Sequence, residues 1–313
     1  MEVFEVVRPG FFTTIQDKGR YGYQQYGVPV SGAMDSYAHV LSNLLLGNDD
    51  GKACLEITLL GPCLQVLRDT AVALTGADLS PTLNDCPLPM WEGVEVSSGD
   101  TISFGSQRKG CRSYLSVVGG IDVSPVMGSR STYVRSRLGG LDGRPLQAGD
   151  RLHSSNSRGN LPLKRLPPQC IPLYSTEHRL RVVLGPQDDY FTEKGIQTFL
   201  GSQYVISAQA DRMGCRLEGP SVEHKAGADI ISDGIPPGAV QVPGDGLPII
   251  MLADRQTTGG YVKIAAVITI DLPELAQAEL GEIVRFSAVT EDEAYRLATE
   301  YEQSIDRLRQ RGR

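Results

Sequence analysis

The sequence predicts a mainly β protein, built as two β domains with a few helices. Three observations favour this fold class. The 313 residues include 35 glycines and 19 prolines without a repeat period, which is typical of chains with many turns. Most segments read as short strands, and the two halves of the chain resemble each other.

The predicted strands end at turns that contain glycine or proline. Leu55–Leu59 alternates apolar and polar residues and stops before Gly61-Pro62, as expected of a strand. The runs 249–252 and 264–270 are almost continuously apolar, which indicates strands buried on both faces. Further strands are predicted at 101–104, 114–118 and 181–184.

Two helices are predicted. The first runs from Asp35 to Leu46, with apolar residues on one face and a stop at Gly47-Asn48. The second starts at Thr290, where Glu293 completes a capping box. Its apolar residues up to Leu308 fall on one face.

The domain boundary is expected near the middle of the chain. Residues 156–178 lie in a stretch rich in Ser, Asn, Pro and basic residues without periodicity, which predicts a linker. It separates an N-terminal lobe, 1–155, from a C-terminal lobe with a terminal helix, 179–313. The segment Tyr114–Asp122 resembles Lys263–Asp271, as two domains of related fold would require; chance similarity between strands is the alternative.

Composition excludes several classes of protein. The net charge is −7 and no Lys/Arg cluster marks a nucleic-acid surface. No apolar stretch reaches the length of a membrane span, and acidic residues near Met1 argue against a signal peptide. The six cysteines are scattered without a C-x-x-C pair, so we expect reduced thiols in a cytoplasmic protein.

The first segment that could carry chemistry is Gly10–Arg20. It concentrates polar side chains, among them Gln16, Asp17 and Arg20, beyond what a plain strand needs. Substrate binding is one interpretation. A turn held by an internal pair between Asp17 and Arg20 is the other.

The second segment is Tyr26–Asp35, which leads into the first predicted helix. Free backbone amides at a helix start suit a carboxylate or phosphate, and in this interpretation Ser31, Gly32 and Met34 are binding residues. In the alternative interpretation Ser31 or Asp35 is only the N-cap of the helix.

The third segment, Asp211–Leu217, places Arg212 beside small residues. It could bind an anion, or it could form an internal ion pair where a strand begins. The sequence leaves both interpretations open.

The fourth segment is the densest. An apolar run ends at Ala253 and is followed by a row of polar side chains and Gly259-Gly260. Burying such a row without partners is costly, and glycines let the backbone approach a ligand, so a binding site is favoured. The candidates here are Gln241, Asp254, Arg255, Gln256, Thr257, Thr258, Tyr261 and Lys263.

Several motifs are absent from the sequence. It has no G-x-x-x-x-G-K-[ST], no G-x-G-x-x-G after a strand and no G-x-S-x-G. No His, Cys and carboxylate set has metal-ligand spacing, so no metal site is expected.

Together these segments resemble the biotin-dependent carboxyltransferase family. The similar pieces run from about Val3 to Phe286 and include TTIQDKGR, GVPVSGAMD, LEITLLGP, GSRSTY, DRMGCRL, SDGIPPGAVQVP and LADRQTTGGY. The family includes the carboxyltransferase domain of urea carboxylase, allophanate hydrolase subunit 2, an antagonist of a histidine-kinase inhibitor, and the C subunit of 5-oxoprolinase. The chain departs from the family pattern at Val262, while Asn43 and Asn48 are retained.

The resemblance implies two cyclophilin-like β-barrel lobes with the site in the cleft between them. From the chemistry of the polar segments, the candidate catalytic residues are Asp35, Asp254, Arg255 and Lys263. The candidate substrate-binding residues are Gln16, Arg20, Ser31, Gly32, Met34, Asn43, Arg212, Gln241, Gln256, Thr257, Thr258 and Tyr261.

The function implied is that of one component of an ATP-dependent 5-oxoprolinase, which opens 5-oxoproline to glutamate. The 5-oxoprolinase B subunit, which is similar to a kinase inhibitor, and the A subunit would be its partners, and ATP would act with the complex. Two alternatives stay open. One is carboxyl transfer from carboxybiotin to urea or a related amide, and the other is a non-catalytic antagonist of a kinase inhibitor.

Overall fold

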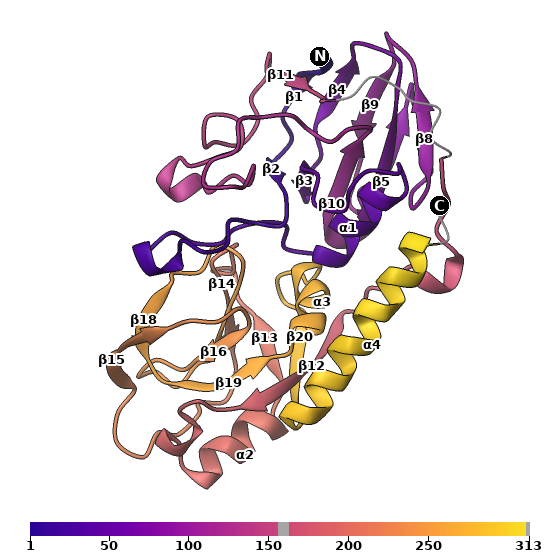
Figure 1. Ribbon diagram of the computed structural model, residues 1–313. Coiled ribbons are helices and arrows are strands. Elements are labelled where there is room, and N and C mark those ends of the chain that lie inside the picture. Colours follow the sequence, from indigo (N-terminus) through magenta and orange to yellow (C-terminus); the bar gives the residue numbers. More distant parts are fainter. Residues whose placement is uncertain (156–162, 311–313) are drawn as a thin grey trace. The chain divides into compact units, whose positions relative to one another are not determined.

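The computed structural model describes residues 1–155 and 163–310, which fall into two compact units. Of these described residues, unit 1 comprises 1–21, 31–155, 163–174 and 308–310, and unit 2 comprises 22–30 and 175–307. The short segment Gly22–Val30 therefore belongs to the unit that the C-terminal half builds. Strands dominate both units (Figure 1), so the prediction of a mainly β protein with a few helices is confirmed.

Unit 1 contains two antiparallel sheets. The six-stranded sheet has the order β11-β1-β4-β9-β6-β7, and the five-stranded sheet has the order β2-β3-β10-β5-β8. The strands of the first are β1 (Glu2–Arg8), β4 (Cys63–Val66), β6 (Pro81–Leu83), β7 (Cys86–Pro87), β9 (Thr101–Phe104) and β11 (Arg151–His153). Those of the second are β2 (Phe12–Gln16), β3 (Cys54–Thr58), β5 (Thr70–Asp78), β8 (Gly93–Val96) and β10 (Lys109–Val117).

Unit 2 is a closed barrel with the strand order β12-β19-β16-β17-β14-β13-β20. Closure pairs every edge strand of the sheet. The strands are β12 (Glu177–Leu184), β13 (Tyr204–Ile206), β14 (Gly214–Glu218), β16 (Ala239–Gln241), β17 (Ile249–Met251), β19 (Lys263–Val267) and β20 (Ile283–Ala288). A separate two-stranded ribbon joins β15 (Asp229–Gly234) to β18 (Thr258–Tyr261).

The helices are α1 (Ser36–Leu44), α2 (Glu193–Gly201), α3 (Leu272–Ala276) and α4 (Glu291–Gln310). Short 3-10 turns occur at Gln24–Tyr26, Val134–Ser136, Pro168–Cys170, Asp188–Tyr190 and Thr269–Asp271. Helix α2 packs on the barrel, where Phe199 stacks on Phe286 with ring centroids 4.3 Å apart. In the described part of the chain, no helix is long and apolar enough to cross a membrane.

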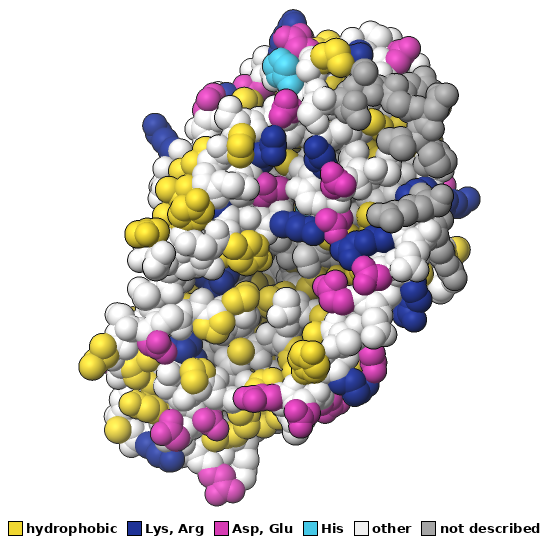
Figure 2. Space-filling model, in the orientation of Figure 1, with side chains coloured by type: hydrophobic (Ala, Val, Ile, Leu, Met, Phe, Trp, Pro, Cys, Tyr) yellow, Lys and Arg dark blue, Asp and Glu magenta, His cyan; other side chains and the backbone are white. Residues whose placement is uncertain are grey.

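Charged side chains of both signs occur on the face drawn in Figure 2. On the face drawn in Figure 2, Lys and Arg side chains are interspersed with Asp and Glu, and no broad basic area is visible there.

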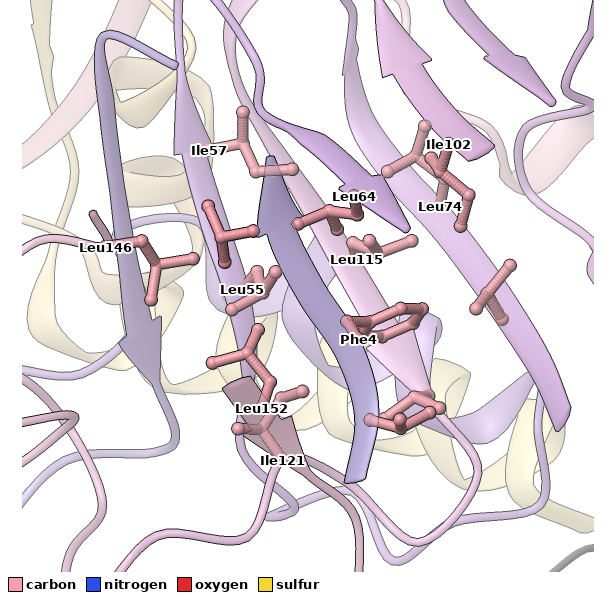
Figure 3. Close-up of a cluster of buried hydrophobic side chains, with 14 of the residues drawn as sticks. Phe4, Leu55, Ile57, Leu64, Leu74, Ile102, Leu115, Ile121, Leu146 and Leu152 are labelled. Atoms are coloured by element: carbon pink, nitrogen blue, oxygen red, sulfur yellow. The ribbon is translucent and has the colours of Figure 1, made fainter. Parts of the chain in front are cut away.

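The core of unit 1 lies between its two sheets. Phe4 and Leu64 of the six-stranded sheet pack with Leu55 and Leu115 of the five-stranded sheet (Figure 3), and each is at most 1% exposed. The outer face of the five-stranded sheet is covered by α1, whose Ala38 and Leu41 join a second cluster. Both faces of β3 are therefore buried, so a polar side chain on this strand needs a partner inside the protein.

Candidate functional site

The loop before α1 ends in a helix cap. Asp35 is 1% exposed, and its Oδ1 accepts a hydrogen bond of 2.9 Å from the Ala38 amide. This is the geometry of an N-cap carboxylate, which satisfies an amide that the helix leaves open. One of the two interpretations of this segment made Asp35 the N-cap of the helix, and the structure shows this cap. The catalytic role of Asp35 stays a prediction.

Two residues of the same loop have left-handed backbone conformations. Ser31 has φ 55° and Gly32 has φ 91°. A Cβ on Gly32 would lie 3.0 Å from the carbonyl carbon and oxygen of Lys18, so the loop requires glycine there. The buried Ser31 Oγ has no hydrogen-bond partner among the described residues. A buried hydroxyl usually has a hydrogen-bond partner, which a water, an ion or a ligand can supply where the protein does not.

The Gly10–Arg20 segment is tied to residues 126–132. Asp17 accepts hydrogen bonds of 2.6 Å from the hydroxyls of Ser129 and Ser131 and from the Arg130 amide. Burial alone would raise the pKa of Asp17, but these hydrogen bonds outweigh it and lower the pKa below its usual value. Arg20, 1% exposed, donates from Nη2 to the Ser131 carbonyl at 2.5 Å. Asp17 and Arg20 thus hold the same segment.

Gln16 lies beside them at the end of β2. Its Nε2 donates to Thr132 O at 3.1 Å and to Thr14 Oγ1 at 3.0 Å. Its buried Oε1 has no partner in the part of the chain that the structure describes. Gln16 and Ser31 therefore both carry a buried polar atom that the described chain leaves unsatisfied.

Asn43 supports the end of α1. Its Nδ2 donates to Lys52 O at 2.9 Å and its Oδ1 accepts from Asn48 Nδ2 at 3.0 Å. Asn48 in turn bonds to Val117 O and to the Gly119 amide. The side-chain amide of Asn43 is fully buried, and both its nitrogen and its oxygen form hydrogen bonds within the protein. These contacts give Asn43 a structural role; its predicted substrate contact stays a prediction.

In unit 2, Arg212 and Asp254 form a buried ion pair. Arg212 Nε lies 2.9 Å from Asp254 Oδ2, and Nη2 lies 3.1 Å from Oδ1. Each side chain is 9% exposed. The third and fourth polar segments of the sequence therefore meet in a two-bond contact, the strongest arrangement of Arg and carboxylate.

Arg255 lines a pocket of about 410 Å³ in unit 2. Its Nε donates to Ile235 O at 2.9 Å and its Nη1 to Leu252 O at 3.1 Å, so the guanidinium is fixed in position. The pocket is lined by Gln24, Pro29, Val30, Gly234, Ile235, Pro236, Pro237, Arg255, Gln256 and Thr257. It thereby joins part of the second polar segment to the fourth.

Lys263 is buried beside the ribbon. Its Nζ lies 3.1 Å from Asp233 Oδ2, while its backbone amide donates to Gln187 Oε1 at 3.1 Å. The hydrogen bond from Lys263 is the main cause that lowers the pKa of Asp233. Gln241 Nε2 contacts Tyr261 O at 3.5 Å. Thr258 and Tyr261 themselves lie exposed on β18.

Glu56 and Tyr114 contact the loop that contains Met34 and Asp35, and neither was predicted as a site residue from the sequence. Both are fully buried, and Glu56 Oε2 accepts hydrogen bonds of 2.8 Å from the Met34 amide and the Tyr114 hydroxyl. The sequence does place a carboxylate, Glu56, within the predicted strand Leu55–Leu59. However, the alternation of apolar and polar residues in that strand predicts that the Glu56 side chain faces solvent, so it was not considered for a buried site.

No group of three or more His, Cys, Asp or Glu side chains within residues 1–155 and 163–310 could hold a metal ion. Four of the six cysteines, Cys54, Cys63, Cys111 and Cys215, are buried.

Residues 26–288 match the family model described as "Carboxyltransferase domain, subdomain A and B". The chain belongs to this family, and the resemblance predicted from its sequence motifs is confirmed. It is 37% identical over 308 residues to the C subunit of 5-oxoprolinase from Escherichia coli K12, covering 98% of this chain and 97% of that protein. It is 36% identical to the C subunit of 5-oxoprolinase from Haemophilus influenzae, covering 95% and 94%.

Among solved structures, the chain is similar to urea carboxylase of Kluyveromyces lactis. The identity is 35% and the TM-score is 0.92, over 98% of this chain and 29% of that one. The chain thus spans less than a third of that larger protein.

Proposed function

We propose that this chain is the C subunit of an ATP-dependent 5-oxoprolinase that opens 5-oxoproline to glutamate. The observation that carries the proposal is the 37% identity to the C subunit of a bacterial 5-oxoprolinase, which extends over 97% of that protein. The fixed Arg255 beside a pocket of about 410 Å³ supports a small anionic substrate.

The chemistry explains what such a protein must supply. The nitrogen of a lactam is a poor leaving group, so ring opening needs activation. ATP provides it by transferring its terminal phosphoryl group to the lactam oxygen. Water then adds to the ring carbon, and departure of phosphate and cleavage of the C–N bond give glutamate. The protein then has to hold the substrate carboxylate and stabilise charge that develops on oxygen.

The proposed roles follow from the contacts of each residue. Arg255 binds the substrate carboxylate, because a guanidinium offers donors in a planar fork. Arg212 contributes a second positive charge, oriented by Asp254 through its two hydrogen bonds. The Ser31 hydroxyl donates to the oxygen that gains charge, and its buried Oγ has no other partner among the described residues.

Asp35, Lys263 and Gln16 complete the proposed set. Asp35 has two roles in this proposal. Its carboxylate caps α1 through Oδ1, and the same carboxylate positions or activates the attacking water. The charge of Lys263, held by Asp233 at 3.1 Å, neutralises phosphate. Gln16 offers its unsatisfied Oε1 as an acceptor. Arg20, Gly32 and Met34 shape this region, whereas Gln241, Gln256, Thr257, Thr258 and Tyr261 are proposed to line the Arg255 side.

The partners proposed are the A and B subunits of 5-oxoprolinase, in the cytoplasm. The two bacterial relatives are each named as the third, or C, component of that enzyme, which supports a complex of several different chains. ATP is proposed as a substrate of the whole complex.

Carboxyl transfer is a second candidate, which the 35% identity to urea carboxylase supports. In that reaction the same polar residues would polarise the oxygen of urea or a related amide. The two candidates differ in whether a biotin carrier protein takes part.

The experiment is reconstitution of the chain with the A and B subunits, followed by measurement of ATP hydrolysis with and without 5-oxoproline. The proposal expects hydrolysis that depends on 5-oxoproline, yields glutamate in equal amount and is insensitive to avidin. Turnover that requires urea and a biotinylated carrier, and stops with avidin, would instead establish carboxyl transfer. An assembled complex without turnover of either substrate would favour a regulatory protein.

A further inference from the structure

Four polar side chains form a continuous row across the five-stranded sheet of unit 1. The register places Thr14 opposite Glu56, Glu56 opposite Tyr114, and Tyr114 opposite Thr75. Residues directly opposite on neighbouring strands share one face of a sheet. All four are fully buried, and we call them the polar row.

The polar row lies under the start of α1. Thr75 Oγ1 donates to Ala38 O in the helix at 2.7 Å, and Tyr114 belongs to the buried cluster that includes Ala38 and Leu41. A fully buried carboxylate such as Glu56 costs on the order of several kcal/mol unless hydrogen bonds offset it. Because both faces of β3 are buried, the Glu56 carboxylate has to find its hydrogen-bond donors inside the protein.

Two members of the row bind consecutive amides of the loop. Glu56 Oε2 accepts from the Met34 amide at 2.8 Å, and the Tyr114 hydroxyl accepts from the Asp35 amide at 2.8 Å. The Tyr114 hydroxyl donates its own hydrogen to Glu56 Oε2 at 2.8 Å. A tyrosine hydroxyl has one hydrogen, so the direction of each bond in this chain is fixed.

The chain of bonds depends on a protonated tyrosine. Burial, and after it the charges of Glu56 and Asp35, hold the pKa of Tyr114 well above its ordinary value. The raised pKa favours the protonated hydroxyl that this network of bonds requires.

These contacts immobilise the loop just after Ser31. The Ala33 amide donates to Asp17 O at 2.9 Å, so the amides of residues 33, 34 and 35 are all used within the protein. They are therefore not the donors for an oxyanion. The group that this part of the loop leaves unused is the buried Ser31 hydroxyl, which has no hydrogen-bond partner among the described residues. Ser31 itself has a left-handed backbone with φ 55°, directly before the residues whose amides are bound.

We propose that Glu56 and Tyr114 are positioning residues, which hold the Met34 and Asp35 amides so that the Ser31 hydroxyl is presented to the substrate oxygen. This inference rests on the proposed function for the role of Ser31. The immobilisation of the loop can be tested without that function.

The first test is hydrogen exchange in Tyr114→Phe, which removes only the relaying hydroxyl. Tyr204→Phe is the matched control, because Tyr204 is also a fully buried tyrosine and its hydroxyl has no hydrogen-bond partner among the described residues. We expect the amides of Met34 and Asp35 to exchange roughly 10-fold faster in Tyr114→Phe and at the wild-type rate in Tyr204→Phe, with α4 protected in both. Equal exchange of the loop in both variants would overturn the proposal.

The second test is a double-substitution cycle in the reconstituted complex. Tyr114→Phe should lower kcat about 10-fold in the wild-type background and less than about 3-fold when Ser31→Ala is already present, because residues acting through one another are not additive. A merely structural role would give the same fold loss in both backgrounds and would overturn the positioning claim. A wild-type complex without 5-oxoproline turnover would defeat the proposed function instead, while the exchange measurement would still decide whether the row holds the loop.

Discussion

Arg212 and Asp254 are joined twice, by a side-chain pair with distances of 2.9 and 3.1 Å and by a backbone hydrogen bond of 2.9 Å from the Asp254 amide to the Arg212 carbonyl. The two residues lie 42 positions apart in the sequence. The contact fixes the start of the third polar segment, Asp211–Leu217, against the row of polar side chains that follows Ala253.

The first prediction concerns the stability of this pair. Asp254→Ala should lower the free energy of unfolding by about 3 kcal/mol, because it removes the partner of a buried guanidinium. Urea denaturation measures the change. Arg108→Ala is the control: its ion pair with Asp78 is 3.8 Å long and the Arg108 side chain is 70% exposed, so the loss should be below about 1 kcal/mol. Similar losses in both variants would contradict the account.

The second prediction separates the two roles of Asp35. Asp35→Asn should keep the cap, because Asn is as good an N-cap as Asp, whereas Asp35→Ala should cost about 1 kcal/mol. If the carboxylate also acts on water, Asp35→Asn should lower kcat roughly 100-fold or more in spite of wild-type stability. Thermal unfolding and steady-state kinetics of the same preparations test this. An active Asp35→Asn complex would leave Asp35 as a cap alone.

The third prediction uses two glycines with positive φ. Gly32→Ala and Gly27→Ala should both introduce a left-handed strain of about 1 kcal/mol. Only at Gly32 would the new Cβ meet other backbone atoms, the carbonyl of Lys18 at 3.0 Å, whereas at Gly27 nothing lies within 4 Å. We therefore expect Gly32→Ala to reduce kcat/KM at least about 10-fold more than Gly27→Ala. Equal activities would show that the loop tolerates displacement.

The fourth prediction is a pH dependence in unit 2. His178 is 1% exposed; its Nε2 lies 2.9 Å from Glu282 and its Nδ1 lies 3.3 Å from Glu274. Burial opposes protonation of the ring, but the two carboxylates outweigh it and raise the pKa of His178 above 6.5. Its stabilising contribution is therefore complete below about pH 6.5 and is lost as the pH rises through the raised pKa.

Unfolding free energies measured from pH 6 to 9 check this prediction. The wild type should lose more stability across that range than His178→Gln, which has no charge to lose. Parallel curves for the two proteins would show that the His178 charge does not stabilise the fold.

Alternation of apolar and polar residues, together with turn and capping residues, predicted several strands and helices from short stretches of sequence. The strand predicted at 101–104 is β9, and the first helix ends before Gly47, whose φ of 70° is the left-handed conformation that glycine favours. The apolar run 264–270 was predicted as one strand, but β19 ends at Val267 because Thr269–Asp271 turns into a 3-10 helix. Helix α2 was missed because only Gly195 and Phe199 are buried along it, too few for a visible apolar face.

Features that depend on distant parts of the chain could not be predicted in this way. No local pattern reveals that Gly22–Val30 belongs with the C-terminal half. The partner of Arg212 was equally hidden, because the sequence suggested an internal pair near Asp211, whereas Asp211 Oδ1 instead accepts from the Met213 and Gly214 amides. Glu56 escaped notice because burial on both faces of β3 arises only when α1 covers the sheet.

The most direct measurement is 5-oxoproline-dependent ATP hydrolysis by the complex reconstituted with Arg255→Met, compared with wild type and Arg255→Lys. Loss of a charge-assisted contact to the substrate carboxylate should reduce kcat/KM roughly 100-fold in Arg255→Met. Arg255→Lys should recover part of this loss, because it keeps the charge without the fork. Wild-type turnover by an intact complex that contains Arg255→Met would contradict the account.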